Sequence, residues 1–285
     1  MFGFLNIYKP KGITSHDVIY KLRKLLHIKK IGHGGTLDPM AEGVLPVAIS
    51  NAAKLIDYLP AKKEYQAKFQ LGVVSDSYDT ECELKYFSDK KVSKEDIKQV
   101  LASFIGQISQ KPPIYSAVKK NGKKLYELAR QGNCDIEIPE RIINVEKIEL
   151  IDFDEKMQQG SIIISCSKGT YIRSIIHDMG QRLNTGAVMT SLTRTVSGGM
   201  NVENSVKLEQ LSDENDMKKY LINPCKLINF KNIEINEVQF EKVKHGMGFN
   251  YQEQDGFVFL CRKNEIEAFA EICNNRVIIK KVFVE

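Results

Sequence analysis

Residues 32–47 read GHGGTLDPMAEGVLPV and form the most tightly specified stretch of the chain. Their four glycines permit backbone conformations that other residues avoid, and their two prolines each fix a backbone dihedral, which together predict a shaped loop. The loop leads into an apolar run from Val44 to Ile49, typical of a buried strand. Asp38 is the single aspartate of the stretch. Its carboxylate can act as a nucleophile, or it can cap a turn, because aspartate before proline commonly opens one.

The segment from His33 to Pro46, HGGTLDPMAEGVLP, resembles the catalytic motif of the TruB family of pseudouridine synthases. Enzymes of that family isomerise the uridine of the TΨC loop in tRNA. Three further segments resemble signatures of the same family in the same order, so the resemblance extends over residues 3–200. It implies the pseudouridine-synthase fold, in which a large, curved mixed sheet carries the active site in a central cleft.

The length of 285 residues exceeds the usual size of one domain, and a hydrophobic content of 42% suffices for a sizeable core. Residue patterns alone therefore indicate an α+β protein with two domains. We expect a catalytic domain over residues 1–229, which contains a basic insertion around 108–140 that clamps RNA, as the resemblance implies. Residues 230–285 are expected to form a small β-rich domain in the position of the family's C-terminal RNA-binding module.

The composition excludes several classes of protein. The sequence has no run of 18 apolar residues and no signal-like start, so we expect a cytoplasmic protein without a membrane partner. Six cysteines are scattered without a C-x-x-C pair, which predicts neither a zinc site nor a disulfide framework. The net charge of +5 is modest, but basic residues cluster without acids in 18–37 and 108–126. Such clusters indicate either RNA contact or an ordinary solvated surface.

Local patterns predict most elements of the large domain. Thr14 and Asp17 form a capping-box pattern ahead of a helical apolar stripe, and Ser93 and Asp96 do the same for a second helix. The expected buried stripe of the second helix is Ile97, Val100, Leu101, Phe104 and Ile105. Strands are expected at 4–8, 64–71, 142–151 and 161–166, helices at 51–59 and 172–183, and polar linkers at 213–223 and 229–232.

Tyr65 lies near the start of an alternating strand and faces inward, which fits either a core tyrosine or an active-site residue. The resemblance favours the active site, because residues 63–65, KEY, stand where the family carries its active-site tyrosine. Arg173, near a helix start, fits an ordinary solvent-facing arginine equally well. Residues 168–174, KGTYIRS, nevertheless resemble a family signature whose tyrosine and arginine belong to the active site. The resemblance thus implies that Tyr65 and Arg173 act with Asp38 as catalytic residues.

Four further residues are expected to bind substrate or support its site. Tyr171 belongs to the signature just described, and Leu192 to a Leu-x-Arg element near the family's base pocket, so the resemblance places both against the target base. His33 can fill the space that a flipped base vacates, or it can be an ordinary loop histidine. Lys9 belongs to a Lys-Pro pair that recurs near the start of family members, and we expect it to support the active-site loop.

Residues 110–130 resemble the family's second signature, which belongs to an insertion that clamps RNA. Within this segment Asn121-Gly122 is a strong signal for a β-hairpin. A mobile, basic arm is therefore predicted, with a short helix that Gly132 caps. Four lysines flank the hairpin turn and are expected to contact RNA: Lys119, Lys120, Lys123 and Lys124.

Conversion of uridine to pseudouridine breaks the glycosidic bond, turns the base and joins C5 to the ribose. Asp38, ionised at neutral pH, can add to the uracil ring or to the ribose C1′, or help eliminate the base to a glycal; the sequence leaves all three routes open. Arg173 is the expected counter-charge. The base must be extruded, at a cost of roughly a few kcal/mol. We expect no metal, no cofactor and no obligate protein partner for a monomeric enzyme that acts on the T arm of tRNA.

Two other interpretations use the same residues. An aspartate-nucleophile phosphatase would carry a second carboxylate two residues after the first and a magnesium site, but Pro39 and Met40 follow Asp38. A non-catalytic RNA-binding or RNA-folding protein would use the basic arm and keep Asp38 for structure alone. Analysis of the product formed from tRNA separates these alternatives from a synthase.

Overall fold

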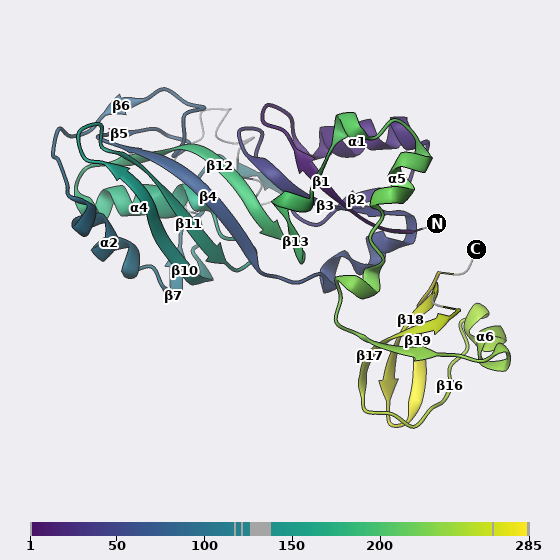
Figure 1. Ribbon diagram of the computed structural model, residues 1–285. Helices are drawn as coiled ribbons and strands as arrows, with labels where there is room; N and C mark the ends of the chain where they lie inside the picture. The colour runs from purple at the N-terminus through teal and green to yellow at the C-terminus, as the bar shows by residue number, and fades with distance from the viewer. Residues whose placement is uncertain (1, 117, 121, 126–137, 264, 284–285) are drawn as a thin grey trace.

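The computed structural model describes residues 2–116, 118–120, 122–125, 138–263 and 265–283. These residues form a ten-stranded mixed sheet flanked by helices and, at one end of the molecule, a five-stranded sheet near the C-terminus (Figure 1). The predicted α+β class and the β-rich C-terminal region are confirmed. Within the described ranges, no helix is long and apolar enough to cross a membrane.

The main sheet has the strand order β14-β1-β3-β12-β4-β11-β10-β7, with β2 paired to β3 and β13 paired to β12. Its strands are β1 (Gly3–Lys9), β2 (Ile31–His33), β3 (Glu42–Ile49), β4 (Lys63–Leu71), β7 (Gly106–Gln110), β10 (Arg141–Asp154), β11 (Gln159–Cys166), β12 (Ala187–Ser197), β13 (Met200–Asn201) and β14 (Val206–Lys207). Two small two-stranded sheets accompany it, β5 (Val73–Val74) with β6 (Lys85–Tyr86) and β8 (Lys119–Lys120) with β9 (Lys123–Lys124). The late strand β12 therefore joins the early strands β3 and β4 at the centre of the sheet.

Three long helices follow the predicted patterns. Both capping boxes form, at Thr14 for the first helix and at Ser93 for the second. The third helix buries its predicted apolar stripe against β4 and β12. The helices are α1 (Ser15–Leu26), α2 (Lys94–Ala102), α4 (Ile172–Leu183), α5 (Glu214–Tyr220) and α6 (Glu237–Lys244), and the 3-10 turns are η1 (Ser50–Tyr58), η2 (Val202–Asn204), η3 (Leu208–Gln210) and η4 (Pro224–Lys226).

Strands β1 and β3 are buried on both faces, because a different layer covers each. Leu5 and Leu45 point into a cluster with α1, whereas Phe4 and Val44 point the other way, toward η1 and the C-terminal sheet. Side chains alternate along a strand, so burial on both faces requires the uninterrupted apolar run that follows the Asp38 loop. Register shifts along β12 add local bends to the sheet at the site.

The C-terminal sheet has the order β15-β17-β18-β19-β16. Its strands are β15 (Lys231–Glu234), β16 (Phe249–Asn250), β17 (Gly256–Arg262), β18 (Glu265–Cys273) and β19 (Arg276–Val282). Phe259 and Phe269 reach from this sheet into one apolar cluster with Phe4 and Leu55 of the N-terminal elements. The two sheets therefore share a buried apolar contact.

Several predictions about individual elements were wrong. Ile105 is 54% exposed, because α2 ends at Ala102 and helical spacing no longer directs its side chain to the core, whereas Phe104 is still buried. The stretch 213–223 is no plain linker, since it contains α5, whose Met217 is fully buried in the α1 cluster. The helix predicted at 51–59 is a 3-10 helix. The helix predicted before Gly132 lies outside the described residues.

Candidate active site

The Asp38 loop, residues 34–41, connects β2 to β3 and is supported from below by a buried arginine. Arg194 of β12 donates from Nε to the carbonyl of Val44 at 2.8 Å, and from its two terminal nitrogens to the carbonyls of Gly35 at 3.1 Å and Thr36 at 3.3 Å. Its side chain is fully buried. One side chain thus joins the start of the loop to the strand β3 that follows it, a role that the Leu-x-Arg pattern alone did not reveal.

Lys9 supports the other end of the same loop. Its ammonium is fully buried and donates to the carbonyls of Ala41 at 2.6 Å and Pro10 at 2.9 Å. Burial lowers the pKa of Lys9 to about 8, an effect that the nearby Asp38 opposes. The buried ammonium therefore holds the loop through its carbonyls, and the role of Lys9 in substrate binding stays a prediction.

Gly43 shows why the loop sequence is so restricted. Its φ of +102° is unfavourable for residues with a side chain, and a Cβ there would lie 2.3 Å from the carbonyl oxygen of Arg194. The close approach occurs where β3 pairs in parallel with β12, Gly43 opposite Arg194. A glycine is required for the two strands to meet beneath the loop.

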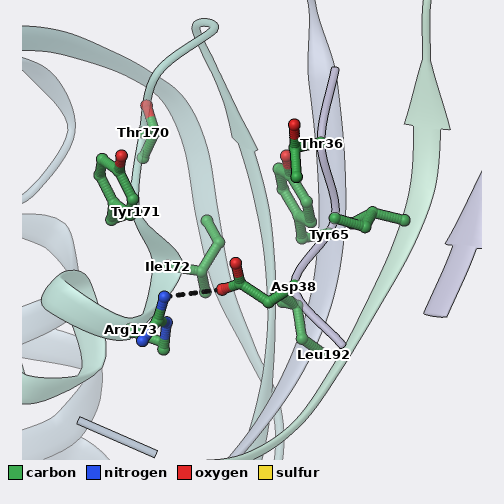
Figure 2. A pocket seen from close by; sticks show the side chains of 9 residues that line it. Thr36, Asp38, Tyr65, Thr170, Tyr171, Ile172, Arg173 and Leu192 are labelled. Atoms are coloured by element: carbon green, nitrogen blue, oxygen red, sulfur yellow. Dashed lines mark ion pairs between the residues drawn. The ribbon is translucent and has the colours of Figure 1, made fainter. Parts of the chain in front are cut away.

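The loop opens into a pocket that combines residues from four segments of the chain (Figure 2). Five of the residues predicted for the site line it, namely Asp38, Tyr65, Tyr171, Arg173 and Leu192. The lining residues are Thr36, Leu37, Asp38, Tyr65, Thr170, Tyr171, Ile172, Arg173 and Leu192. The separate family signatures therefore meet in one place.

Arg173 and Asp38 form an ion pair in the pocket. Arg173 Nη2 lies 2.8 Å from Asp38 Oδ2, and the arginine side chain is 5% exposed whereas the aspartate side chain is 38% exposed (Figure 2). Arg173 also donates to the carbonyls of Ser77 and Tyr115, each at 3.0 Å. These contacts fix the guanidinium, so that it holds an accessible carboxylate at a defined orientation.

A second carboxylate, that of Asp79, also contacts Arg173. Sequence analysis did not predict this residue for the site, because it lies in a polar loop. Its side chain is fully buried, with Oδ2 at 3.3 Å from Arg173 Nη1. Oδ1 accepts hydrogen bonds from the hydroxyl of Ser77 at 2.5 Å and from the backbone N–H of Glu81 at 2.9 Å. Arg173 therefore bridges a buried carboxylate and an accessible one. The available signal was only an aspartate among polar residues, since nothing local links residue 79 to residue 173.

A ring stack fixes the backbone beside Asp79. Tyr78 adopts a left-handed conformation with φ of +64°, and its ring stacks on His177 of α4 with centroids 3.8 Å apart and planes inclined by 14°. The carbonyl of Tyr78 accepts a hydrogen bond from the N–H of Met189 in β12 at 3.0 Å. Burial lowers the pKa of His177, so the stacked imidazole is neutral at neutral pH.

Two tyrosines and a leucine give the pocket its apolar walls. Tyr65 and Leu192 are both buried, at 7% exposure, on the neighbouring strands β4 and β12. Burial raises the pKa of the Tyr65 phenol, against the opposing effect of the Arg194 guanidinium, and burial likewise raises the pKa of Tyr171. Both phenols are therefore protonated at neutral pH.

The remaining predicted residues lie outside the pocket lining. His33 belongs to β2, where burial lowers its pKa and Nδ1 has no hydrogen-bond partner in the described structure. The four arm lysines form the strands β8 and β9, paired as Lys119 with Lys124 and Lys120 with Lys123. The predicted hairpin is thus present, although Asn121 of its turn lies outside the described residues.

The insertion contacts the pocket directly. Val118, Leu125 and Ile138 form a small apolar cluster, and Tyr171 packs against it. Gln110, at the end of β7, exchanges hydrogen bonds with the backbone of Tyr171 at 2.8 and 3.0 Å. The described residues contain no group of three or more His, Cys, Asp or Glu side chains placed to hold a metal ion.

Comparison with family models defines the class of protein to which this fold and pocket belong. A model of the TruB family pseudouridylate synthase N-terminal domain matches residues 23–172, and a model of the tRNA pseudouridylate synthase B C-terminal domain matches residues 173–225. The protein is thus an enzyme of the pseudouridylate synthase class. More specifically, the chain belongs to the TruB family.

Curated relatives and solved structures agree with this assignment. The chain is 41% identical to tRNA pseudouridine synthase B of Clostridium tetani over 87% of its own length and 85% of that protein. It is 40% identical to tRNA pseudouridine synthase B of Lactobacillus acidophilus over 94% of each. A chain of an H/ACA RNP bound to a substrate RNA containing 2′-deoxyuridine superposes with a TM-score of 0.73 at 26% identity, over 100% of this chain and 86% of that one.

Proposed function

We propose that the protein isomerises uridine to pseudouridine in the T loop of tRNA and that Asp38 is the nucleophile. The observation that carries the proposal is the 2.8 Å pairing of an accessible Asp38 with a buried Arg173 inside an aromatic-lined pocket. The relatives named tRNA pseudouridine synthase B support tRNA as the substrate. The uridine of the TΨC loop follows from the resemblance of the Asp38 motif to the family's catalytic motif.

The reaction breaks the bond between N1 and the ribose C1′, turns the base, forms a bond from C5 to C1′, releases the C5 proton to solvent and adds a proton to N1. One proton leaves and one is taken up, and the heavy atoms of the base are retained, so no oxidant or reductant is needed. An accessible carboxylate fits addition to the ring, addition to C1′ and elimination to a glycal equally well. In each route Arg173 orients Asp38 and offsets its charge in a site that closes over the base.

The walls of the pocket suit a base that has been extruded from the RNA. Tyr65, Tyr171 and Leu192 present two aromatic rings and an aliphatic side chain, which can enclose a pyrimidine. Because burial raises the pKa of Tyr65, its phenol acts as a base toward the C5 proton only if it gives up its own proton in the same step. Packing of the base is the role that its protonated state supports better.

RNA is held in this proposal by the insertion around residues 108–140 and by the C-terminal region 230–285, with catalysis assigned to residues 1–229. The insertion carries four lysines around its hairpin turn, Lys119, Lys120, Lys123 and Lys124, and this local excess of positive charge supports contact with RNA phosphates. We propose that the His33 side chain fills the space in the RNA that the flipped base vacates. We expect a monomer to bind the T arm without an obligate protein partner.

The test is incubation of unmodified tRNA, tritiated at C5 of its uridines, with the pure protein in EDTA and then in magnesium. Tritium release with pseudouridine mapped to the T loop is expected, and Asp38→Asn should abolish release while tRNA affinity stays within several-fold. Asp89→Asn, at an exposed loop position, serves as the matched control. Normal turnover by Asp38→Asn would contradict the assigned nucleophile. Binding without product by the wild type would instead indicate an RNA-binding protein.

A further inference from the structure

Lys63, which has no acidic partner among the residues that the structure describes, lies beside the Asp38 loop. Lys63 is two residues before Tyr65 in β4, so both side chains are on the same face of the strand. A methyl group built at Gly35 would lie 3.0 Å from Lys63 Nζ and 3.7 Å from Arg194 Nη1. Two cationic side chains therefore converge on the Gly35–Thr36 backbone, and Thr36 lines the pocket together with Tyr65 (Figure 2).

The donors of Lys63 are unused in the described structure. No hydrogen bond or ion pair joins its ammonium to another described residue, whereas Arg194 uses its donors on three carbonyls. Burial first, and then Arg194 and Lys168, lower the pKa of Lys63 to about 8. A largely desolvated cation among other cations is unfavourable in the free protein, and such groups concentrate at functional sites.

We propose that Lys63 binds a backbone phosphodiester of the RNA, next to the nucleotide held in the pocket. This inference rests on the proposed function, because it takes the pocket as the site of the target uridine. A phosphodiester is a monoanion whose oxygens can accept from all three N–H groups of the ammonium. It would also offset the positive field of Arg194 and Lys168. Lys63 thereby fixes the phosphodiester backbone of the flipped nucleotide, and Asp38 contacts the base or the sugar of that nucleotide.

The proposal predicts a particular pH dependence. The groups that face Lys63 are Arg194 of β12, Lys168 of the turn after β11, and Cys166 of β11, which burial keeps neutral by raising its pKa to about 11. Bound phosphate favours the charged ammonium, so above pH 8 binding must restore a proton that free Lys63 has lost. Affinity for RNA therefore falls as pH rises from 7 to 9.5.

The first experiment measures binding of unmodified tRNA by filter retention across salt concentrations at pH 7. Lys63→Met should reduce the salt slope by about one unit. Lys68→Met is the matched control, because Lys68 is exposed on the opposite face of the same strand. Lys63→Arg, whose charge does not titrate, should keep affinity constant from pH 7 to 9.5. Lys9, whose pKa is likewise about 8, is present in both the wild type and Lys63→Arg. The difference in pH dependence between these two proteins therefore reports the titration of Lys63 alone.

The second experiment replaces single phosphodiesters flanking the target uridine with neutral methylphosphonates. Replacement of one of the two linkages, 5′ or 3′ of the target uridine, should weaken binding by the wild type by the same factor as the substitution Lys63→Met does with unmodified RNA. The same replacement should not weaken binding by the Lys63→Met variant any further. Equal losses in both proteins, or a salt slope that Lys63→Met leaves unchanged, would overturn the inference. Pseudouridine is measured in the same samples, so a wild type that binds without forming product refutes the proposed function separately.

Discussion

Arg173 contacts two carboxylates whose surroundings differ. Asp38 is partly open to the pocket, whereas Asp79 has no exposure and lies 3.3 Å from the guanidinium. A buried carboxylate depends on its partner for stability, but an accessible one can be solvated by water. The same arginine therefore contributes to folding through Asp79, and under the proposed function it contributes to chemistry through Asp38.

Two double-mutant cycles can separate these contributions. Arg173→Met should cost about 3–5 kcal/mol of stability, because it leaves Asp79 as an unpaired buried charge. Combining it with Asp79→Asn should cost clearly less than the sum of the single changes, whereas combining it with Asp38→Asn should give nearly additive losses. Urea denaturation measures both cycles. Strong coupling to Asp38 and none to Asp79 would reverse the assignment.

Two lysines, the buried Lys9 and the half-buried Lys63, predict that the free protein gains stability in mild alkali. Burial lowers the pKa of both Lys9 and Lys63 from 10.5 to about 8. Below pH 8 the folded and unfolded chains are both protonated there, so the cost of burying charge is fully present. Between pH 8 and 10.5 the folded chain has lost protons that the unfolded chain keeps, so stability rises.

Urea midpoints at pH 7.5 and 9.5 measure this gain. Lys63→Met should show roughly half of it, because one of two similar groups is removed. Identical gains in the wild type and Lys63→Met would contradict the lowered pKa of Lys63. RNA affinity and stability should thus change in opposite directions over the same pH range.

At the scale of elements, α4 and the loop at 75–81 are joined by the stack of Tyr78 on His177. The stack maintains a left-handed residue next to Asp79, and a tyrosine in that conformation needs such support. We infer that the stack positions Asp79, and through it Arg173, without touching substrate.

His177→Ala should therefore lower the single-turnover rate by about tenfold and leave tRNA affinity unchanged, since displacement by a fraction of an ångström is enough for such losses. His177→Phe keeps a flat ring and should restore the rate. Rates are measured by tritium release at saturating enzyme. Equal rates in the wild type and His177→Ala would show that the loop holds its conformation without the stack.

Patterns within a few neighbouring residues predicted the helices and strands well. They could not predict contacts between residues that are distant in the sequence. The capping boxes at Thr14 and Ser93 and the alternation around Tyr65 depend on neighbours within a few residues, which a sequence displays directly. The burial of Arg173 depends on Asp79, which is 94 residues earlier, so no periodicity reveals it. Likewise α5 offers one buried residue, Met217, among polar ones, too few for an apolar pattern.

At the scale of the whole molecule, the C-terminal sheet is attached by an aromatic-rich contact. Tyr58 of η1 lies 4.8 Å from Phe269 and 5.4 Å from Phe257, between ring centroids, and Phe230 stacks on Phe269. The predicted domain boundary at residue 230 therefore separates two parts of the chain whose side chains share one continuous apolar core. The assignment of residues 230–285 as an RNA-binding module stays a prediction, since neither family match extends beyond residue 225.

Deletion of residues 231–285 is expected to destabilise the remaining chain as well as weaken RNA binding. The cut exposes Phe4, Ala48 and Leu55, which the C-terminal sheet now covers. Thermal melting and gel filtration should show a lower midpoint and self-association. A monomeric truncation that melts like the full chain would mean that the contact contributes little.

The central position of β12 has a consequence for how the protein is made. Strands β3 and β4 follow each other in the chain but pair with β12 instead of with each other, and β12 is completed only at Ser197. A nascent chain therefore carries the Asp38 loop long before β12, the strand whose Arg194 holds that loop, has left the ribosome. Because closing such long chain segments slows folding, the insertion of β12 is expected to limit the refolding rate. Until that step, a chain of residues 1–186 leaves the edges of β3 and β4 that face each other unpaired. A chaperone that binds incompletely folded chains would bind at these edges.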